Sequence, residues 1–167
     1  MRGATTRWVL SLGLALGLGL TSQDFARAAT AASDPAAEAR SATPSPAPAL
    51  TRQWLALRRL QGRFDGAPWN DAVDRWQGPK HTLMQQLARF ALQERLDADR
   101  LDALLGAPDQ VLPAGAAGQT LFLQQAQWQG VPAGDLWLYR WRGSHDQLVF
   151  ALHEGEVAAA GWWYALE

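Results

Sequence analysis

Few residues in this chain have the types and spacing that catalysis or metal binding requires. There are three histidines, His81, His145 and His153, and no cysteine. No two of these histidines have the separation typical of zinc ligands. Ser144, His145 and Asp146 are the residue types of a hydrolase triad, but consecutive residues cannot pass a proton in the required geometry, so a turn is expected there. The sequence therefore predicts no catalytic residue, no metal site and no bound cofactor.

The charged residues point to the same class of protein. The formal net charge is −1, so the chain has no general electrostatic attraction to nucleic acid. No carboxylate lies in an apolar context of the kind that prepares a general acid. Two short basic runs are interpreted as solvated faces; they consist of Arg52, Arg58, Arg59 and Arg63, and of Arg140 and Arg142. An enzyme with an unrecognised carboxylate site, such as a periplasmic hydrolase, is left as an alternative.

Tryptophan is the residue type in clear excess, with nine in 167 residues. A buried aromatic side chain removes about 150–250 Å² from water, which helps a domain without disulfides to build a core. Trp54, Trp69 and Trp76 lie in segments with helical spacing of apolar residues and are expected to be core residues.

A second group of aromatic residues lies on one face of a predicted strand. Trp137, Tyr139 and Trp141 alternate with Leu136 and Leu138, so the two sets point to opposite faces. Both faces are core only if helices cover both sides of the sheet. The aromatic face is therefore either core or an exposed ledge for a partner protein or a glycan, and Trp137, Tyr139 and Trp141 are the candidate binding residues.

The first 28 residues are typical of a secretory signal. Arg2 and Arg7 precede an apolar run over residues 8–20, and Ala26 and Ala28 frame a cleavage site after Ala28. The run is shorter than the roughly 20 residues that a membrane span needs. The sequence predicts a periplasmic or secreted protein with no transmembrane span after cleavage; an uncleaved anchor is the alternative. There is no cysteine for lipid attachment.

The rest of the chain is expected to form a linker and one domain. Residues 29–50 are rich in Ala and Pro and are predicted to be a disordered tether. Residues 51–167 are predicted to fold as one α+β domain, with helices on an antiparallel meander of three or four strands. Helices are expected over 51–61, 68–77, 81–94 and 98–105, and strands over 136–142, 147–153 and 156–166, with a weaker strand over 120–128.

One helix end carries a motif that can be compared with known families. It consists of Leu104, Leu105, Gly106, Pro108 and Asp109. The two leucines should pack on the sheet, while the glycine and the proline end the helix. Downstream come a Trp-x-Tyr element at 137–139, an apolar strand at 148–150 and a Gly-x-Val turn at 155–157.

This order of elements resembles the SmpA/OmlA (BamE-like) domain family over residues 81–167. The resemblance implies a non-catalytic helix-helix-strand-strand-strand domain, found in cell-envelope lipoproteins and binding proteins. Three features depart from the family: the missing lipobox cysteine, the long 110–135 segment, whose role the sequence does not define, and the additional helical segment 51–76.

Together these observations predict an exported cell-envelope protein that binds an unidentified envelope protein or assists envelope assembly. A secreted inhibitor or ligand-binding module of the same fold is the alternative.

Overall fold

The computed structural model of the chain describes residues 45–165. The predicted signal and residues 29–44 of the predicted linker lie outside the described residues. The helices are α2 (Ala47–Arg58), α3 (Pro79–Gln93), α4 (Ala98–Leu105) and α5 (Gln119–Gln125), with a short 3-10 helix, η1, over Arg63–Asp65. The strands are β1 (Gln110–Leu112), β2 (Gln127–Gly130), β3 (Asp135–Arg142), β4 (Asp146–His153) and β5 (Glu156–Tyr164).

The strands form one open antiparallel sheet in the order β1-β3-β4-β5-β2. The α+β class and the β3-β4-β5 meander are confirmed. The sheet has five strands instead of three or four, because residues 110–130 supply β1 at one edge and β2 at the other. The strand expected over 120–128 is wrong in its first part, where the chain forms α5. The weak alternation there reflects a helix that anchors to the sheet through Phe122.

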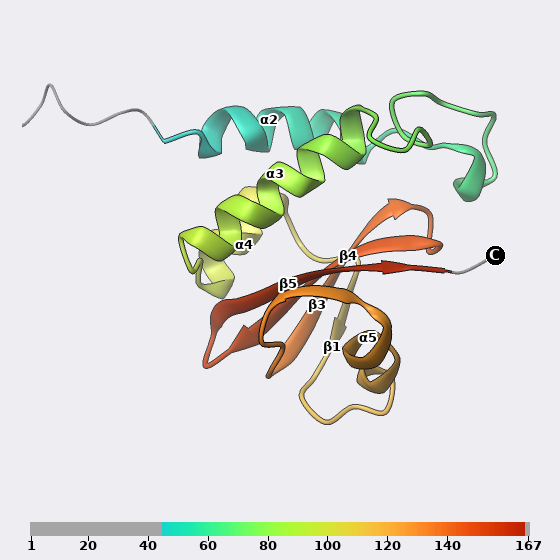
Figure 1. Cartoon of the computed structure of the whole chain (residues 1–167). Coiled ribbons are helices and arrows are strands. Elements are labelled where there is room, and N and C mark those ends of the chain that lie inside the picture. The colour runs from blue at the N-terminus through green and yellow to red at the C-terminus, as the bar shows by residue number, and fades with distance from the viewer. Residues whose placement is uncertain (1–44, 166–167) are drawn as a thin grey trace, which may run out of the picture. The chain divides into compact units, whose positions relative to one another are not determined.

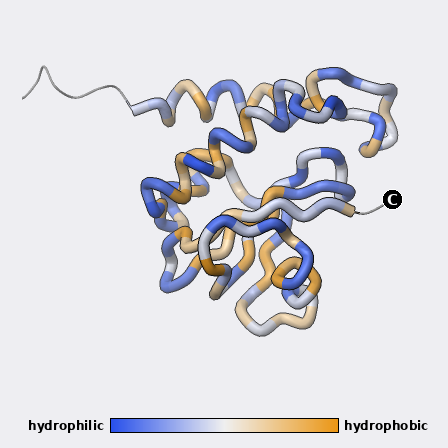
Figure 2. The backbone as a smooth tube through the Cα atoms, viewed as in Figure 1, coloured by the Kyte–Doolittle hydropathy of each residue, from blue (hydrophilic) through white to orange (hydrophobic). Residues whose placement is uncertain are grey.

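Helices cover both faces of the sheet (Figure 1). Helices α2, α3 and α4 pack on one face, and apolar residues alternate with polar ones along α2 and α3 (Figure 2). On the other face, Phe122 of α5 packs against Leu136 and Leu138 of β3. Both rows of β3 side chains are therefore available for core packing.

This arrangement decides where the candidate binding residues lie. Tyr139 and Trp141 are completely buried beneath α2, α3 and α4. Trp137 lies on the same face, is partly buried and packs against the same core. The fold thus places Tyr139 and Trp141 in the core, and they do not form an exposed aromatic ledge.

The helix-end motif connects α4 to the sheet. Leu104 and Leu105 are buried. Gly106 has φ 72° and ψ 175°, a backbone region essentially restricted to glycine. Pro108 and Asp109 then lead directly into β1. The residues that end the helix also set the start of the first strand.

Side chains from two other elements bind the carbonyl groups at this helix end. Trp54 Nε1 of α2 donates to Leu105 O at 2.7 Å, and Arg58 Nη1 donates to the same oxygen at 2.7 Å. The Tyr139 hydroxyl of β3 donates to Gly106 O at 3.1 Å. Carbonyl groups that the helix leaves without partners are thereby satisfied, and α2, α4 and β3 are held together.

Helix α2 begins at Ala47, four residues before the position expected from the sequence. Pro48 lies in its first turn, where a missing N–H and a fixed φ are compatible with a helix. The prediction of a disordered tether over residues 29–50 is therefore wrong for residues 47–50, which are helical.

The segment between α2 and α3 is not the helix predicted over 68–77. It forms turns after η1, and Trp69 and Trp76 are 54% and 53% exposed, so the expectation that they are core residues is wrong. The buried carboxylate of Asp74 accepts the backbone N–H groups of Arg63 and Asn70. A side chain that binds backbone groups in this way competes with helix formation.

We expect Gly62→Ala to destabilise the protein by about 1–3 kcal/mol, a typical cost of overpacking. A Cβ at Gly62 would lie 2.3 Å from Asp74 Oδ1 and force the carboxylate away from the N–H groups it binds. The measurement is the free energy of unfolding in urea. Gly118→Ala is the matched control, because its Cβ would meet nothing closer than 3.5 Å, and it should cost less than about 1 kcal/mol. Equal stability of the two variants would show that Asp74 does not fix this loop.

Candidate functional site: a cleft between helix α3 and the edge strand β2

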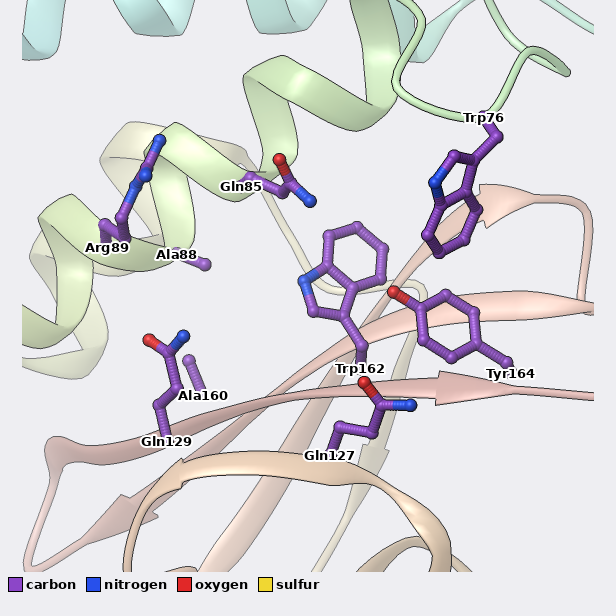
Figure 3. A pocket seen from close by; sticks show the side chains of 9 residues that line it. All are labelled: Trp76, Gln85, Ala88, Arg89, Gln127, Gln129, Ala160, Trp162 and Tyr164. Atoms are coloured by element: carbon purple, nitrogen blue, oxygen red, sulfur yellow. The ribbon is translucent and has the colours of Figure 1, made fainter.

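A cleft of about 470 Å³ lies between α3 and the β5-β2 edge of the sheet. Helix α3 forms one wall, the two strands form the other, and the loop before α3 closes one end (Figure 3). Its lining combines aromatic rings with carboxamide groups and one guanidinium. The lining residues are Trp76, Gln85, Ala88, Arg89, Gln127, Gln129, Ala160, Trp162 and Tyr164.

Three aromatic rings form one end of the cleft. Trp162 and Tyr164 alternate along β5, so both point to the α3 side, and their rings are parallel within 2° at a centroid distance of 5.9 Å. The Trp76 ring lies 5.4 Å from Tyr164 and is tilted by 52°. All three rings keep exposed surface, so each offers part of its face or edge to a ligand.

The polar wall comes from β2 and depends on a glycine in β5. Gln127 pairs with Trp162 and Gln129 with Ala160, so both glutamines share the α3 side of the sheet with the cleft. Trp128 points to the other face and packs over Gly161, where a Cβ would lie 2.7 Å from the indole ring. Gly161 therefore allows β2 to dock closely beside β5.

Gln85 and Arg89 of α3 line the cleft on the side opposite these strands. Gln85 reaches toward the aromatic rings, whereas the Arg89 side chain extends along α3, away from the strands (Figure 3). In the part of the chain that the structure describes, no carboxylate, serine or histidine lines the cleft. The lining offers flat aromatic surface, amide donors and acceptors and one cation, groups that can contact a ligand.

The Tyr164 hydroxyl adds one further polar group to the aromatic end. It points toward Trp162 (Figure 3). Burial, and secondarily the Asp146 carboxylate, raises the pKa of Tyr164 to about 12. The hydroxyl therefore stays protonated at neutral pH and can donate a hydrogen bond to a ligand.

His81 lies in a buried layer beneath the aromatic rings. An isolated histidine at the start of a predicted helix is expected to be solvated, but the side chain of His81 is fully buried. The ring stacks on Trp141 at 4.1 Å and 10°. It also meets Trp162 edge-on at 4.8 Å and Trp76 at 4.7 Å. Trp141 thus packs beneath the cleft and is itself completely buried.

The surroundings of His81 keep it neutral. Burial lowers the pKa of His81 to about 4, and the nearby Arg142 guanidinium acts in the same direction, while the Asp146 carboxylate opposes it. The Gln77 N–H donates to Nδ1 at 3.1 Å, so the neutral ring carries its proton on Nε2. The Gln85 carboxamide lies 3.3 Å from Nε2. A neutral, fully hydrogen-bonded imidazole is a packing element of the cleft floor.

The other residues considered for chemistry lie elsewhere. His145 and Asp146 lie at the turn between β3 and β4, where Asp146 pairs with Arg142 and the His145 ring packs on Phe64 at 4.9 Å. This is the turn expected from the sequence. Within residues 45–165, no cluster of His, Asp or Glu has the arrangement of a metal site.

Sequence reasoning did not identify the residues that line the cleft. Trp76 was assigned to a helix core, and Trp162 and Tyr164 were treated as part of a strand with no assigned role. The alternation of Trp162 and Tyr164 places them on one face, but only the position of β2 shows that this face borders an opening.

Comparisons of the chain with models of protein families, with curated proteins and with solved structures give no match. Among the described helices, none is long and apolar enough to cross a membrane.

The buried, neutral His81 predicts a loss of stability in mild acid. Unfolding exposes the ring and returns its pKa to about 6.5, so the unfolded state binds more protons below that pH. The contribution is fully present above pH 6.5 and is lost as the pH falls toward 4. Between pH 7 and pH 5 it amounts to about 2 kcal/mol.

Unfolding free energies measured across this pH range should fall less steeply for His81→Phe than for the unchanged protein. His153→Gln is the control, because His153 is exposed and outside the aromatic layer. Parallel pH profiles for the protein and for His81→Phe would contradict the assignment of His81 as a group held neutral by the fold.

Proposed function

We propose that this domain is a non-catalytic binding module that holds an extended segment of a partner protein in the cleft between α3 and β2. The observation that carries the proposal is the exposed aromatic end formed by Trp76, Trp162 and Tyr164. Trp, Tyr and Arg are the residue types enriched at the centres of protein interfaces. Arg89 completes this set at the other end of the same cleft.

The edge position of β2 indicates the shape of the partner segment. Among the strands within residues 45–165, β2 pairs only with β5, so one row of its backbone N–H and C=O groups borders no other described strand. An extended peptide can add to such an edge through main-chain hydrogen bonds while alternate side chains enter a neighbouring pocket. Gln127 and Gln129 then flank the peptide, and the aromatic end receives an apolar side chain.

The cellular setting of this proposal comes from the sequence. The predicted signal over residues 1–28 favours a periplasmic or secreted location, so we propose a cell-envelope protein as the partner. The resemblance of residues 81–167 to the SmpA/OmlA (BamE-like) family supports the same setting, with envelope assembly as the process. The motif from Leu104 to Asp109 contributes to this function only by holding α4 on the sheet.

A glycan or another small ligand is the second candidate, and one feature favours it. The carboxamides of Gln85, Gln127 and Gln129 surround aromatic faces, and a sugar ring combines an apolar face with hydroxyl groups that amides bind. A secreted ligand-binding module of this kind needs no free strand edge. The two candidates therefore differ in whether β2 takes part through its backbone.

Site-specific photo-crosslinking in cell envelopes tests the protein-partner proposal. A photoreactive phenylalanine analogue at Gln129 of the full-length chain should give discrete protein adducts. The same analogue at Leu121, an exposed residue of α5 on the opposite face, is the matched control and should give none. No adducts at residue 129, or the same adducts at both positions, would contradict the proposal.

Trp76→Ala tests the aromatic end directly. Adduct formation from residue 129 should fall at least about 30-fold, the equivalent of a 2 kcal/mol hot-spot residue. Only a few degrees of melting temperature should be lost, because half of the Trp76 ring is already exposed. Gln53→Ala, at an exposed position of α2, is the control. A glycan occupant would instead appear as adducts that glycosidases, but not proteases, remove.

A further inference from the structure

A second, smaller cavity lies where the end of α2, the start of α3 and the end of β3 meet. Its volume is about 230 Å³. Four of its lining residues are basic and two are acidic. The lining residues are Arg58, Arg59, Leu60, Gln61, Asp65, Lys80, Asp109, Arg140 and Gly143. Taking Lys and Arg as +1 and Asp as −1, the lining carries a net charge of +2.

Lys80 is the unusual member of this set. Only 4% of its surface is exposed, yet within the described residues its ammonium group makes no hydrogen bond and no ion pair. A buried charge without a partner is costly. Because Lys80 lines the cavity, an anion that enters the cavity can supply the partner that the protein does not.

The position of Lys80 in α3 adds to this cost. It is the second residue of the helix, where the helix dipole is positive and disfavours a cation. Burial lowers the pKa of Lys80, while Asp65 and Asp109 oppose this shift through space. Both carboxylates have other partners: Asp65 accepts the Gly62 N–H, and Asp109 binds Arg58 and the Arg140 N–H. Neither is left as a dedicated counterion.

Two further cations at the cavity are available to a ligand. Arg59 and Arg140 are exposed. Their side chains make no hydrogen bond or ion pair within residues 45–165. Arg58, by contrast, is held by Leu105 O and Asp109 Oδ1. Lys80, Arg59 and Arg140 therefore approach the cavity from α3, α2 and β3 with unused donors.

We propose that this cavity binds a phosphate group, with Lys80 as its buried cation and Arg59 and Arg140 at its rim. A phosphate monoester carries a charge of about −1.5 to −2 at pH 7, which matches the excess of positive charge in the lining. Its several acceptor oxygens suit donors that arrive from three elements. The phosphate belongs either to the free ion or to a small molecule or lipid headgroup that carries it.

Calorimetric titration of the whole protein with inorganic phosphate, glucose 1-phosphate and vesicles containing phosphatidic acid tests the site and separates these sources. Binding strongest for inorganic phosphate supports a site for the free ion. Stronger binding of the ester or of the vesicles supports a site for the phosphate of a larger ligand. Absence of saturable binding of all three at millimolar concentrations overturns the proposal.

Two variants tie binding to the named residues. Lys80→Met keeps the aliphatic stem and should weaken binding at least tenfold, without lowering the melting temperature in phosphate-free buffer, since it removes an unpaired buried charge. Arg140→Gln changes an exposed side chain that the fold does not use and should weaken binding about threefold to tenfold. Arg100→Gln, at an exposed residue of α4, is the control with the same loss of charge and should leave binding unchanged.

The same variants also provide the decisive negative result. If Lys80→Met and Arg140→Gln bind phosphate as tightly as Arg100→Gln does, the cavity is not the site. Because Arg140 is exposed, this comparison remains valid even if Lys80→Met folds poorly. Crosslinking from residue 129 is independent of these titrations, so failure of the phosphate site and failure of the partner cleft are distinguishable.

Discussion

The carboxylate of Asp74 is the contact on which both ligand-facing regions depend. The chain between α2 and α3 contains one short 3-10 helix and is otherwise built from turns with local backbone hydrogen bonds. Asp74 ties these turns together by accepting the N–H groups of Arg63 and Asn70. Trp76 follows two residues later and Lys80 six residues later. Because one buried anion fixes the path of this segment, it places an aromatic ring at the cleft and a cation at the smaller cavity.

The floor of the cleft illustrates how a polar residue can serve packing. His81 is surrounded by the rings of Trp141, Trp162 and Trp76, and both of its nitrogens have partners. A leucine at this position would fill similar space, but it would leave the Gln77 N–H unpaired. The histidine satisfies that donor and still presents a flat face to Trp141. The result is a rigid support for the exposed rings, whose orientation is thus set before a ligand arrives.

The sequence predicts those parts of the fold that depend on neighbours along the chain. The helix over 98–105 was expected to end at Gly106, and in the structure its start is capped by Asp97, which accepts the Arg100 N–H. The meander was expected from alternation and turn residues. Failures occur where distant contacts override local pattern. Trp76 has helical spacing, but a carboxylate two residues earlier organises the chain differently. The burial of His81 depends on Trp141, which comes sixty residues later. The site was missed because its open side depends on which strand pairs with β5.

The opening itself follows from the route by which β2 reaches the sheet. Helix α5 packs on the face opposite α3 through Phe122, and a single residue separates it from β2. Trp128 turns toward that same face and donates to Phe122 O at 3.2 Å. The glutamines on either side of it must then point toward the α3 side, where their carboxamides remain hydrated. The alternation of Gln127, Trp128 and Gln129 thus specifies an edge strand with one face packed against the protein and one face exposed to solvent. Apolar residues at the glutamine positions would favour closure against α3, whereas the glutamines keep the faces of Trp162 and Tyr164 accessible to a partner.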